Sequence, residues 1–213
     1  MRSHCKLTGS DGRAAGRFRA MVDAKAWWPR ESLVKLKLIA GLLAVLSASL
    51  VSSAQSDWRQ KVKDELPLMG HRNWIVIVDS AYPLQTSSGI ETVATDADEL
   101  SVMDYVFDTL EHSKHVRPIV HTDKELEFVS EGEAPGVGAY REAVMKRIAG
   151  FPRDSLLHES LIERLNEAGK NFHVLVLKTS MAIPYTSVFL QLDCRYWSAE
   201  SEARLREMMK HSR

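Results

Sequence analysis

The sequence predicts an α/β fold, in which a single domain with a largely parallel sheet flanked by helices is preceded by a signal peptide. Short apolar runs of strand length alternate with longer amphipathic segments along most of the chain, the order typical of a parallel sheet covered by helices. The run Trp74–Val78 contains only Trp, Ile and Val, as expected of a strand buried on both faces. We expect the domain over residues 55–213 and a leader over residues 1–54.

Five segments have apolar residues at the spacing of an amphipathic helix. The first places Trp58, Val62 and Leu66 on one face and ends near Pro67, a residue that stops helices. The fourth ends at Gly169, which is typical of a helix carboxyl end, and the fifth is mainly polar. In chain order, the predicted helices cover residues 57–68, 98–112, 139–148, 156–168 and 198–213.

The apolar runs between these helices predict the strands. They are rich in Val, Ile, Leu and Phe and are bounded by turn-forming residues. The predicted strands cover residues 74–78, 90–93, 116–120, 172–178 and 188–192. Residues 126–129 are a further strand candidate, and the Gly- and Pro-containing segment 131–136 is a predicted loop.

The balance of 28 basic and 28 acidic residues hides an asymmetry between leader and domain. Residues 1–55 hold nine basic and three acidic residues, so residues 56–213 carry a net charge of −6. An acidic domain argues against nucleic acid as a partner, since phosphates require clustered Lys and Arg. It equally disfavours binding to an anionic membrane surface.

The leader has the features of an export signal. Lys35 and Lys37 precede an apolar stretch over residues 38–51, and small residues follow up to Ala54. This order predicts a secretory signal peptide cleaved near Ala54 and a periplasmic or secreted protein. The apolar stretch is short for a membrane span, and an uncleaved membrane anchor is the alternative. The basic segment before Lys35 is long for a signal peptide, so we expect a later start, at Met21 or another codon.

Cysteine usage limits the possible chemistry. Cys5 lies in the leader, so Cys194 is the single cysteine of the predicted mature chain. That chain can form no intramolecular disulfide and no metal site built on thiolates. No other motif indicates a metal centre, and we expect neither a metal nor a cofactor.

Polar residues flank the predicted strand 74–78 and precede the predicted strand 188–192. His71 comes before residues 74–78, and Asp79 follows them directly. Open α/β sheets bind ligands outside the carboxyl ends of their strands, which makes Asp79 a candidate binding residue. In the alternative interpretation, Asp79 only caps the next turn and His71 is an ordinary surface residue. A second polar segment, residues 178–187, leads into the strand 188–192.

Together these motifs resemble those of the RbsD/FucU family of ribose pyranases and fucose mutarotases. The matching residues are Gly70-His71, Asp79 eight positions after His71, Pro83, Ile90-Glu91, and Tyr185 and Ser187 before an apolar strand. The resemblance covers roughly residues 62–197. It implies a cofactor-independent isomerase that interconverts anomers or ring forms of a free ribose- or fucose-like monosaccharide. It also implies His71 as proton donor, with Asp79, Tyr185, Ser187 and His158 as sugar-binding residues.

Several departures from the family pattern keep two alternatives open. Ser187 stands where the family has Asn, Ser180-Met181 replaces Gly-Glu, and the segment 112–151 is longer than in compact members. One alternative is a monosaccharide-binding protein of the same fold without catalysis. The other is an unrelated α/β domain of the cell envelope.

The spacing of His71 and Asp79 allows two arrangements of a site that uses both residues. If residues 72–78 are extended, the two side chains lie roughly 25 Å apart at about 3.3 Å per residue, farther than a monosaccharide reaches. Either the His71 loop folds back, or a site joins His71 of one subunit to Asp79 of another. The family forms ring-like oligomers with sites near subunit contacts, so we expect a homo-oligomer whose dissociation abolishes activity.

Overall fold

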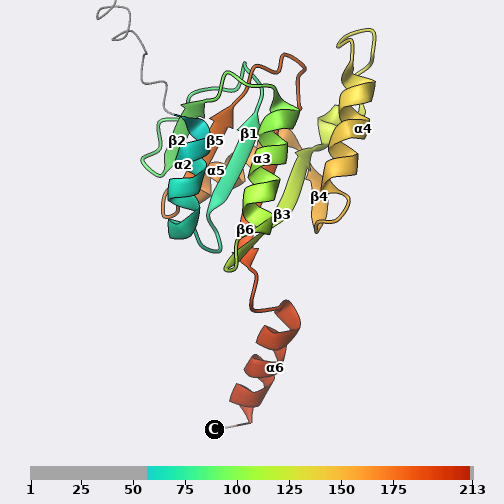
Figure 1. Cartoon of the computed structure of the whole chain (residues 1–213). Coiled ribbons are helices and arrows are strands. Elements are labelled where there is room, and N and C mark those ends of the chain that lie inside the picture. The colour runs from blue at the N-terminus through green and yellow to red at the C-terminus, as the bar shows by residue number, and fades with distance from the viewer. Residues whose placement is uncertain (1–56, 212–213) are drawn as a thin grey trace, which may run out of the picture. The chain divides into compact units, whose positions relative to one another are not determined.

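Strand β1 (Trp74–Val78) lies inside a six-stranded sheet in the computed structural model, which describes residues 57–211 (Figure 1). The strand order is β2-β5-β1-β6-β3-β4. Strand β6 pairs antiparallel with both of its neighbours, and all other neighbouring pairs are parallel. The predicted α/β class with a largely parallel sheet is confirmed. The other strands are β2 (Ile90–Ala94), β3 (Val116–Asp123), β4 (Arg153–Leu156), β5 (Val174–Lys178) and β6 (Val188–Cys194).

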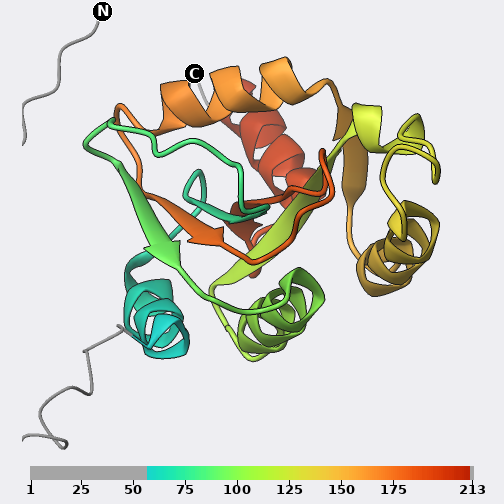
Figure 2. The same ribbon diagram turned by 90° about the horizontal axis from the view of Figure 1, so that it is seen from above.

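Helices cover both faces of the sheet. Figure 2 shows α2 and α3 on one face and α5 on the other. The bounds are α2 (Trp58–Glu65), α3 (Glu99–Glu111), α4 (Val137–Ile148), α5 (His158–Ala168) and α6 (Ala199–Lys210), with 3₁₀ turns η1 (Leu66–Leu68) and η2 (Lys124–Glu127). Helix α6 has no buried residue. None of the helices within residues 57–211 is long and apolar enough to span a membrane.

The apolar run of β1 is explained by two cores, one on each side of the sheet. All five of its residues are buried. Ile75 and Ile77 pack in the core that includes residues of α2, α3 and α4, whereas Trp74, Val76 and Val78 pack with Leu161 and Leu165 of α5. Alternating side chains point to opposite faces of a strand, and here each face of β1 meets a helical layer.

The structure departs from the predicted elements in two places. Residues 126–129 were predicted as a strand candidate, which is wrong: Lys124–Glu127 forms η2, and the side chain of Phe128 is 74% exposed. Strand β4 was not predicted, because Arg153–Leu156 is a short edge strand without a buried residue and so lacks an apolar pattern. The predicted signal peptide lies outside the described residues.

Candidate functional site

Most of the predicted site residues lie at one edge of the sheet, the edge formed by the carboxyl ends of β1 and β3. The parallel strands β1 and β3 end there at Val78 and Asp123. Because β6 runs antiparallel between them, its first residue, Val188, lies opposite Ile77 on one side and Thr122 on the other. The segment before β6 therefore reaches the same edge as the residues that follow β1 and β3.

A cavity of about 400 Å³ lies at this edge. Asp79, His158 and Tyr185, three of the five predicted site residues, line it. Tyr82, Pro83, Ile183 and Pro184 add apolar surface to its wall. Its volume is within the range of small-molecule sites.

His158 enters this cavity from the amino end of α5. As the first residue of the helix, it has a backbone N–H without an intrahelical partner, and Leu157 before it offers no side-chain cap. The carboxylate of Glu125 accepts that N–H instead, at 3.1 and 3.0 Å from its two oxygens. Glu125 thereby fixes the start of α5 against η2.

The imidazole of His158 is paired with a buried carboxyl group. Its Nδ1 lies 3.0 Å from Oδ1 of Asp123, whose side chain is completely buried. Burial raises the pKa of Asp123, although the hydrogen bond to His158 opposes part of that effect. The same hydrogen bond is the main cause of the raised pKa of His158. The contact therefore favours the charged imidazolium.

Tyr185 faces His158 from the loop before β6. The two rings meet edge to face with their centroids 5.7 Å apart. The backbone of Tyr185 has φ = 59°, a left-handed conformation that is uncommon for a residue with a side chain. Thr186 anchors the loop, because its hydroxyl donates to the carbonyl of Ile183 at 3.1 Å and its own carbonyl accepts from Tyr140 at 2.7 Å.

Asp79 and Tyr82 form the other wall of the cavity. Oδ1 of Asp79 accepts the backbone N–H of Ala81 at 2.7 Å, so the turn-capping contact of the alternative interpretation is present. A carboxylate has about four acceptor positions, and this contact uses one. Tyr82 is buried and donates its hydroxyl to Gln85 at 3.0 Å. Burial raises the pKa of Tyr82, which keeps its phenol neutral.

The other two predicted residues do not line this cavity. Ser187 is buried, and its hydroxyl has no hydrogen-bond partner among the described residues. His71 is exposed in the turn that precedes β1, at the opposite edge of the sheet, where it lines a second cavity with Cys194 and Trp197. Since β1 is extended between His71 and Asp79, a single chain does not bring these two side chains together.

Three acidic residues near the cavity were missed by the sequence analysis. Asp123 ends β3 as Asp79 follows β1, but the predicted strand stopped at residue 120, so this repeated acid at a strand end was hidden in the sequence. Glu125 follows it in η2. Glu99, the first residue of α3, is fully buried, and burial raises its pKa to about 8. Its spacing from Val102 and Met103 places Glu99 on the buried face of α3, which is the signal that could have revealed it.

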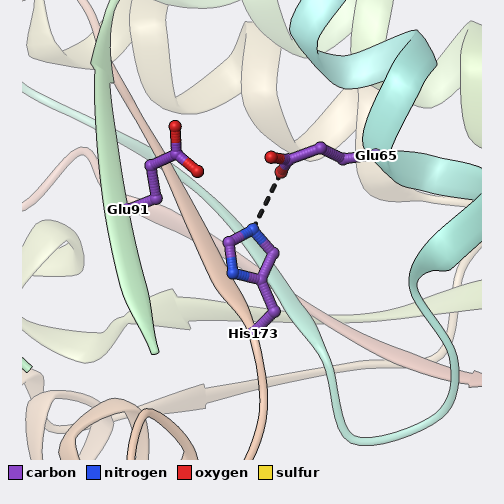
Figure 3. Close-up of side chains that lie close together, drawn as sticks. All are labelled: Glu65, Glu91 and His173. Atoms are coloured by element: carbon purple, nitrogen blue, oxygen red, sulfur yellow. Dashed lines mark hydrogen bonds and ion pairs between the residues drawn. The ribbon is translucent and has the colours of Figure 1, made fainter. Parts of the chain in front are cut away.

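One group of three side chains in the described part of the chain has the spacing of metal ligands (Figure 3). Glu91 and His173 lie at the amino ends of β2 and β5, and Glu65 is the last residue of α2. Nε2 of His173 is 2.8 Å from Glu65. The ammonium group of Lys61 lies 2.7 Å from a carboxylate oxygen of Glu65 and 2.7 Å from one of Glu91. Lys61 thus supplies the positive charge that a metal ion would bring, and its pKa is raised by these contacts.

Comparison with solved structures finds similar folds at low identity. RbsD from Bacillus subtilis, solved with D-ribose, is 16% identical with a TM-score of 0.45, over 62% of this chain and 91% of that chain. Fucose mutarotase from Streptococcus pneumoniae, solved with L-fucose, is 18% identical with a TM-score of 0.44, over 67% of this chain and 98% of that chain. FucU from Bifidobacterium longum is 15% identical with a TM-score of 0.45, over 63% of this chain and 94% of that chain.

The chain is similar to RbsD and FucU proteins. These are the proteins whose motifs the sequence resembles. No protein-family model and no curated protein matches the chain.

Proposed function

We propose that this protein is a cofactor-independent isomerase, a mutarotase or pyranase that interconverts anomers or ring forms of a free monosaccharide. The observation that carries the proposal is the meeting of Asp79, His158 and Tyr185 at one cavity of about 400 Å³. These residues lie far apart in the chain, and the sequence alone predicts each of them as a binding residue. An unrelated envelope domain with an accidental motif match gives no reason for them to share a cavity.

The groups of the cavity suit the reaction. Opening the hemiacetal ring of a sugar requires loss of the anomeric hydroxyl proton and delivery of a proton to the ring oxygen, and general acid–base groups accelerate both transfers. A carboxylate at Asp79 and an imidazole at His158 provide an acceptor and a donor. The apolar surfaces of Pro83, Pro184 and Tyr185 are suited to the C–H faces of a sugar ring.

We propose that the protein is a homo-oligomer in which His71 of one copy reaches the cavity of another. The resemblance implies His71 as a proton donor, and in one chain it lies at the opposite edge of the sheet from Asp79. Apolar side chains around the cavity support a contact with a second copy: Leu84, Phe128 and Leu157 are 74%, 74% and 57% exposed. Burying such groups between subunits is favourable. We also propose export of the protein, as its sequence predicts.

A second candidate function is sugar binding without catalysis. It is favoured by the two positions at which the sequence departs from the family. Ser187 is buried away from the cavity, so it brings no polar group to a sugar there. Met181, which stands in place of a Glu, packs against the apolar core next to α2, α3 and α4. A site that has lost two polar contacts can retain binding while losing transition-state stabilisation.

Anomer exchange followed by NMR saturation transfer tests the proposal. We would compare the full chain with its His71→Ala variant on ribose, fucose, galactose and glucose. Exchange that is accelerated by the protein and lost in the variant supports an isomerase and identifies its sugar class. Exchange at the buffer rate for all four sugars, together with measurable sugar binding, would favour the second candidate.

A further inference from the structure

We propose that His158 donates the proton to the ring oxygen of the sugar, and that Asp123 is the positioning residue that orients the imidazole of His158. This inference rests on the proposed function and deepens it. It places the proton for the ring oxygen on His158, whereas the family resemblance implies His71 as proton donor and His158 only as a sugar-binding residue. His71 of a second copy then contributes to the site by contacting the sugar, not by carrying this proton. It also gives a role to Asp123, which no motif indicated.

The imidazole of His158 is bound at one nitrogen and available at the other. Nδ1 is 3.0 Å from Oδ1 of Asp123, and within residues 57–211 Nε2 makes no hydrogen bond. The side chain of His158 is 26% exposed and lines the cavity, whereas that of Asp123 is completely buried behind it. A histidine that gives Nδ1–H to a carboxylate carries its reactive nitrogen at Nε2. The pair therefore presents Nε2–H to a molecule in the cavity.

Three separate elements hold His158 in this orientation. The carboxylate of Asp123 at the end of β3 fixes Nδ1, and the carboxylate of Glu125 in η2 fixes the backbone N–H. The ring of Tyr185, from the loop before β6, packs edge to face against the imidazole. Such an arrangement limits rotation of the ring, and a fixed donor is what positioned acid catalysis requires.

The charges around His158 favour its protonated form. The groups that face it are acids: Asp123 from β3, Glu125 from η2 and Glu159 from α5 itself, with the ring of Tyr185 opposite. The amino end of α5 opposes a positive charge, but the direct hydrogen bond to Asp123 outweighs it, and the pKa of His158 is raised. The imidazole is also the only hydrogen-bond donor to the side chain of Asp123 among the described residues, since Oδ2 has no partner.

The proton transfers balance over one cycle. Nε2–H of the imidazolium gives its proton to the ring oxygen as the bond between this oxygen and the anomeric carbon breaks, and the ring oxygen retains the bonding electrons. The carboxylate of Asp79, in the same cavity, takes the proton of the anomeric hydroxyl, whose O–H electrons form the carbonyl bond. Closure on the other face of the carbonyl reverses both transfers and returns each proton to its residue.

Asp123→Asn and His158→Gln in the full chain test the inference. Asn keeps the shape of Asp123 but removes its charge, so we expect a lower pKa of His158 in an NMR titration of the imidazole. In a plot of exchange rate against pH, the fall in rate on the alkaline side should move to lower pH by as much as the pKa of His158 falls. In His158→Gln we expect exchange to fall about 100-fold, the low end of general acid–base contributions, while sugar binding persists. The matched control is Asp108→Asn, which removes the carboxylate beside the exposed His112 on α3 and should leave the profile unchanged.

The outcomes separate this inference from the function on which it rests. If the unmodified protein accelerates no exchange, the isomerase proposal fails and the role of His158 with it. If the protein is active but Asp123→Asn keeps the unmodified pH profile, or His158→Gln keeps its rate, only the present inference is overturned. Should Asp123→Asn fail to fold, His158→Gln decides alone, because it replaces a partly exposed side chain.

Discussion

The hydroxyl of Tyr140 donates a 2.7 Å hydrogen bond to the carbonyl oxygen of Thr186, and this bond joins α4 to the loop that carries Tyr185. Both residues are buried. The cavity wall before β6 is therefore fastened to a helix from a distant part of the sequence. The bond supports a loop in which Tyr185 adopts a left-handed backbone conformation, whose cost the surrounding contacts must offset.

Tyr140→Phe should destabilise the protein by about 1–3 kcal/mol, because it leaves the buried carbonyl of Thr186 without this donor. The loss is measured as a change in the free energy of unfolding in urea. Tyr105→Phe is the matched control, since its hydroxyl donates to the carbonyl of Arg59 at a more exposed position. Equal losses in the two variants would contradict a special role for the buried bond.

Glu99 should make stability fall as the pH rises. Its pKa is raised from 4.5 to about 8 by burial, so between these values the folded protein holds a proton that the unfolded chain releases. Stability should therefore decrease between about pH 4.5 and 8, and Glu99→Gln should flatten this dependence. Above pH 8 the variant should be more stable than the unmodified protein by on the order of a few kcal/mol, at about 1.4 kcal/mol per pKa unit.

Thermal unfolding between pH 5 and 9 measures this effect. Glu111→Gln, at the exposed carboxyl end of the same helix, is the control and should keep the slope of the unmodified protein. If stability fell with pH as steeply in Glu99→Gln as in the unmodified protein, the buried carboxyl group would not be the cause of the pH dependence.

Lys61→Met should lower the stability of the protein slightly and allow the cluster of Glu65, Glu91 and His173 to bind a metal ion. Removing the ammonium leaves two carboxylates and an imidazole with ligand atoms within 4.8 Å of one another, a donor set suited to Zn²⁺. We expect a loss of about 1 kcal/mol or less, as for partly exposed ion pairs, and a larger increase in Tm on adding Zn²⁺ than in the unmodified protein. Lys63→Met, on the same helix, is the control; a similar Zn²⁺ response in all three proteins would reject the prediction.

Mixed oligomers should reveal whether the site is shared between subunits. We expect His71→Ala and Asp79→Asn to be inactive separately. After subunit exchange of an equal mixture, about a quarter of the sites should combine an intact His71 with an intact Asp79 from different chains, if each site draws on two copies. Anomer exchange measured before and after mixing tests this. No recovery despite proven subunit exchange would contradict a site shared between subunits.

The fold was predictable where the apolar pattern was strong. The run Trp74–Val78 indicated a strand buried on both faces, and the two cores on either side of β1 explain why it contains no polar residue. Strand β3 was recognised only in part, because His121 and Thr122 interrupt its apolar pattern. His121 is nevertheless buried, since Asp154 and Gln191 satisfy its ring nitrogens.

The candidate site was only partly predictable for a related reason. Motifs identified Asp79, Tyr185 and His158, but they did not indicate the partner of His158, since Asp123 lies at the end of β3 that the pattern missed. The meeting of these residues depends on β6 lying between β1 and β3, and strand order is a long-range property that local spacing does not carry. Glu99 was missed because an acidic residue at the start of a helix is usually exposed, although its spacing from Val102, Met103 and Val106 places it on the buried face of α3.

Because β6 runs antiparallel to β1 and β3, its two ends lie at opposite ends of these strands, and each end can be studied separately. Its carboxyl end delivers Cys194 to the edge of the sheet where His71 lies, and the two residues line the same cavity there. Cys194 is the only cysteine of residues 57–211 and has a free thiol. In a chain with Cys5 replaced, a fluorophore attached to Cys194 would report on the surroundings of His71 while leaving the cavity of Asp79 and His158 unlabelled. The chain thus carries its own attachment point for observing subunit contact separately from sugar binding.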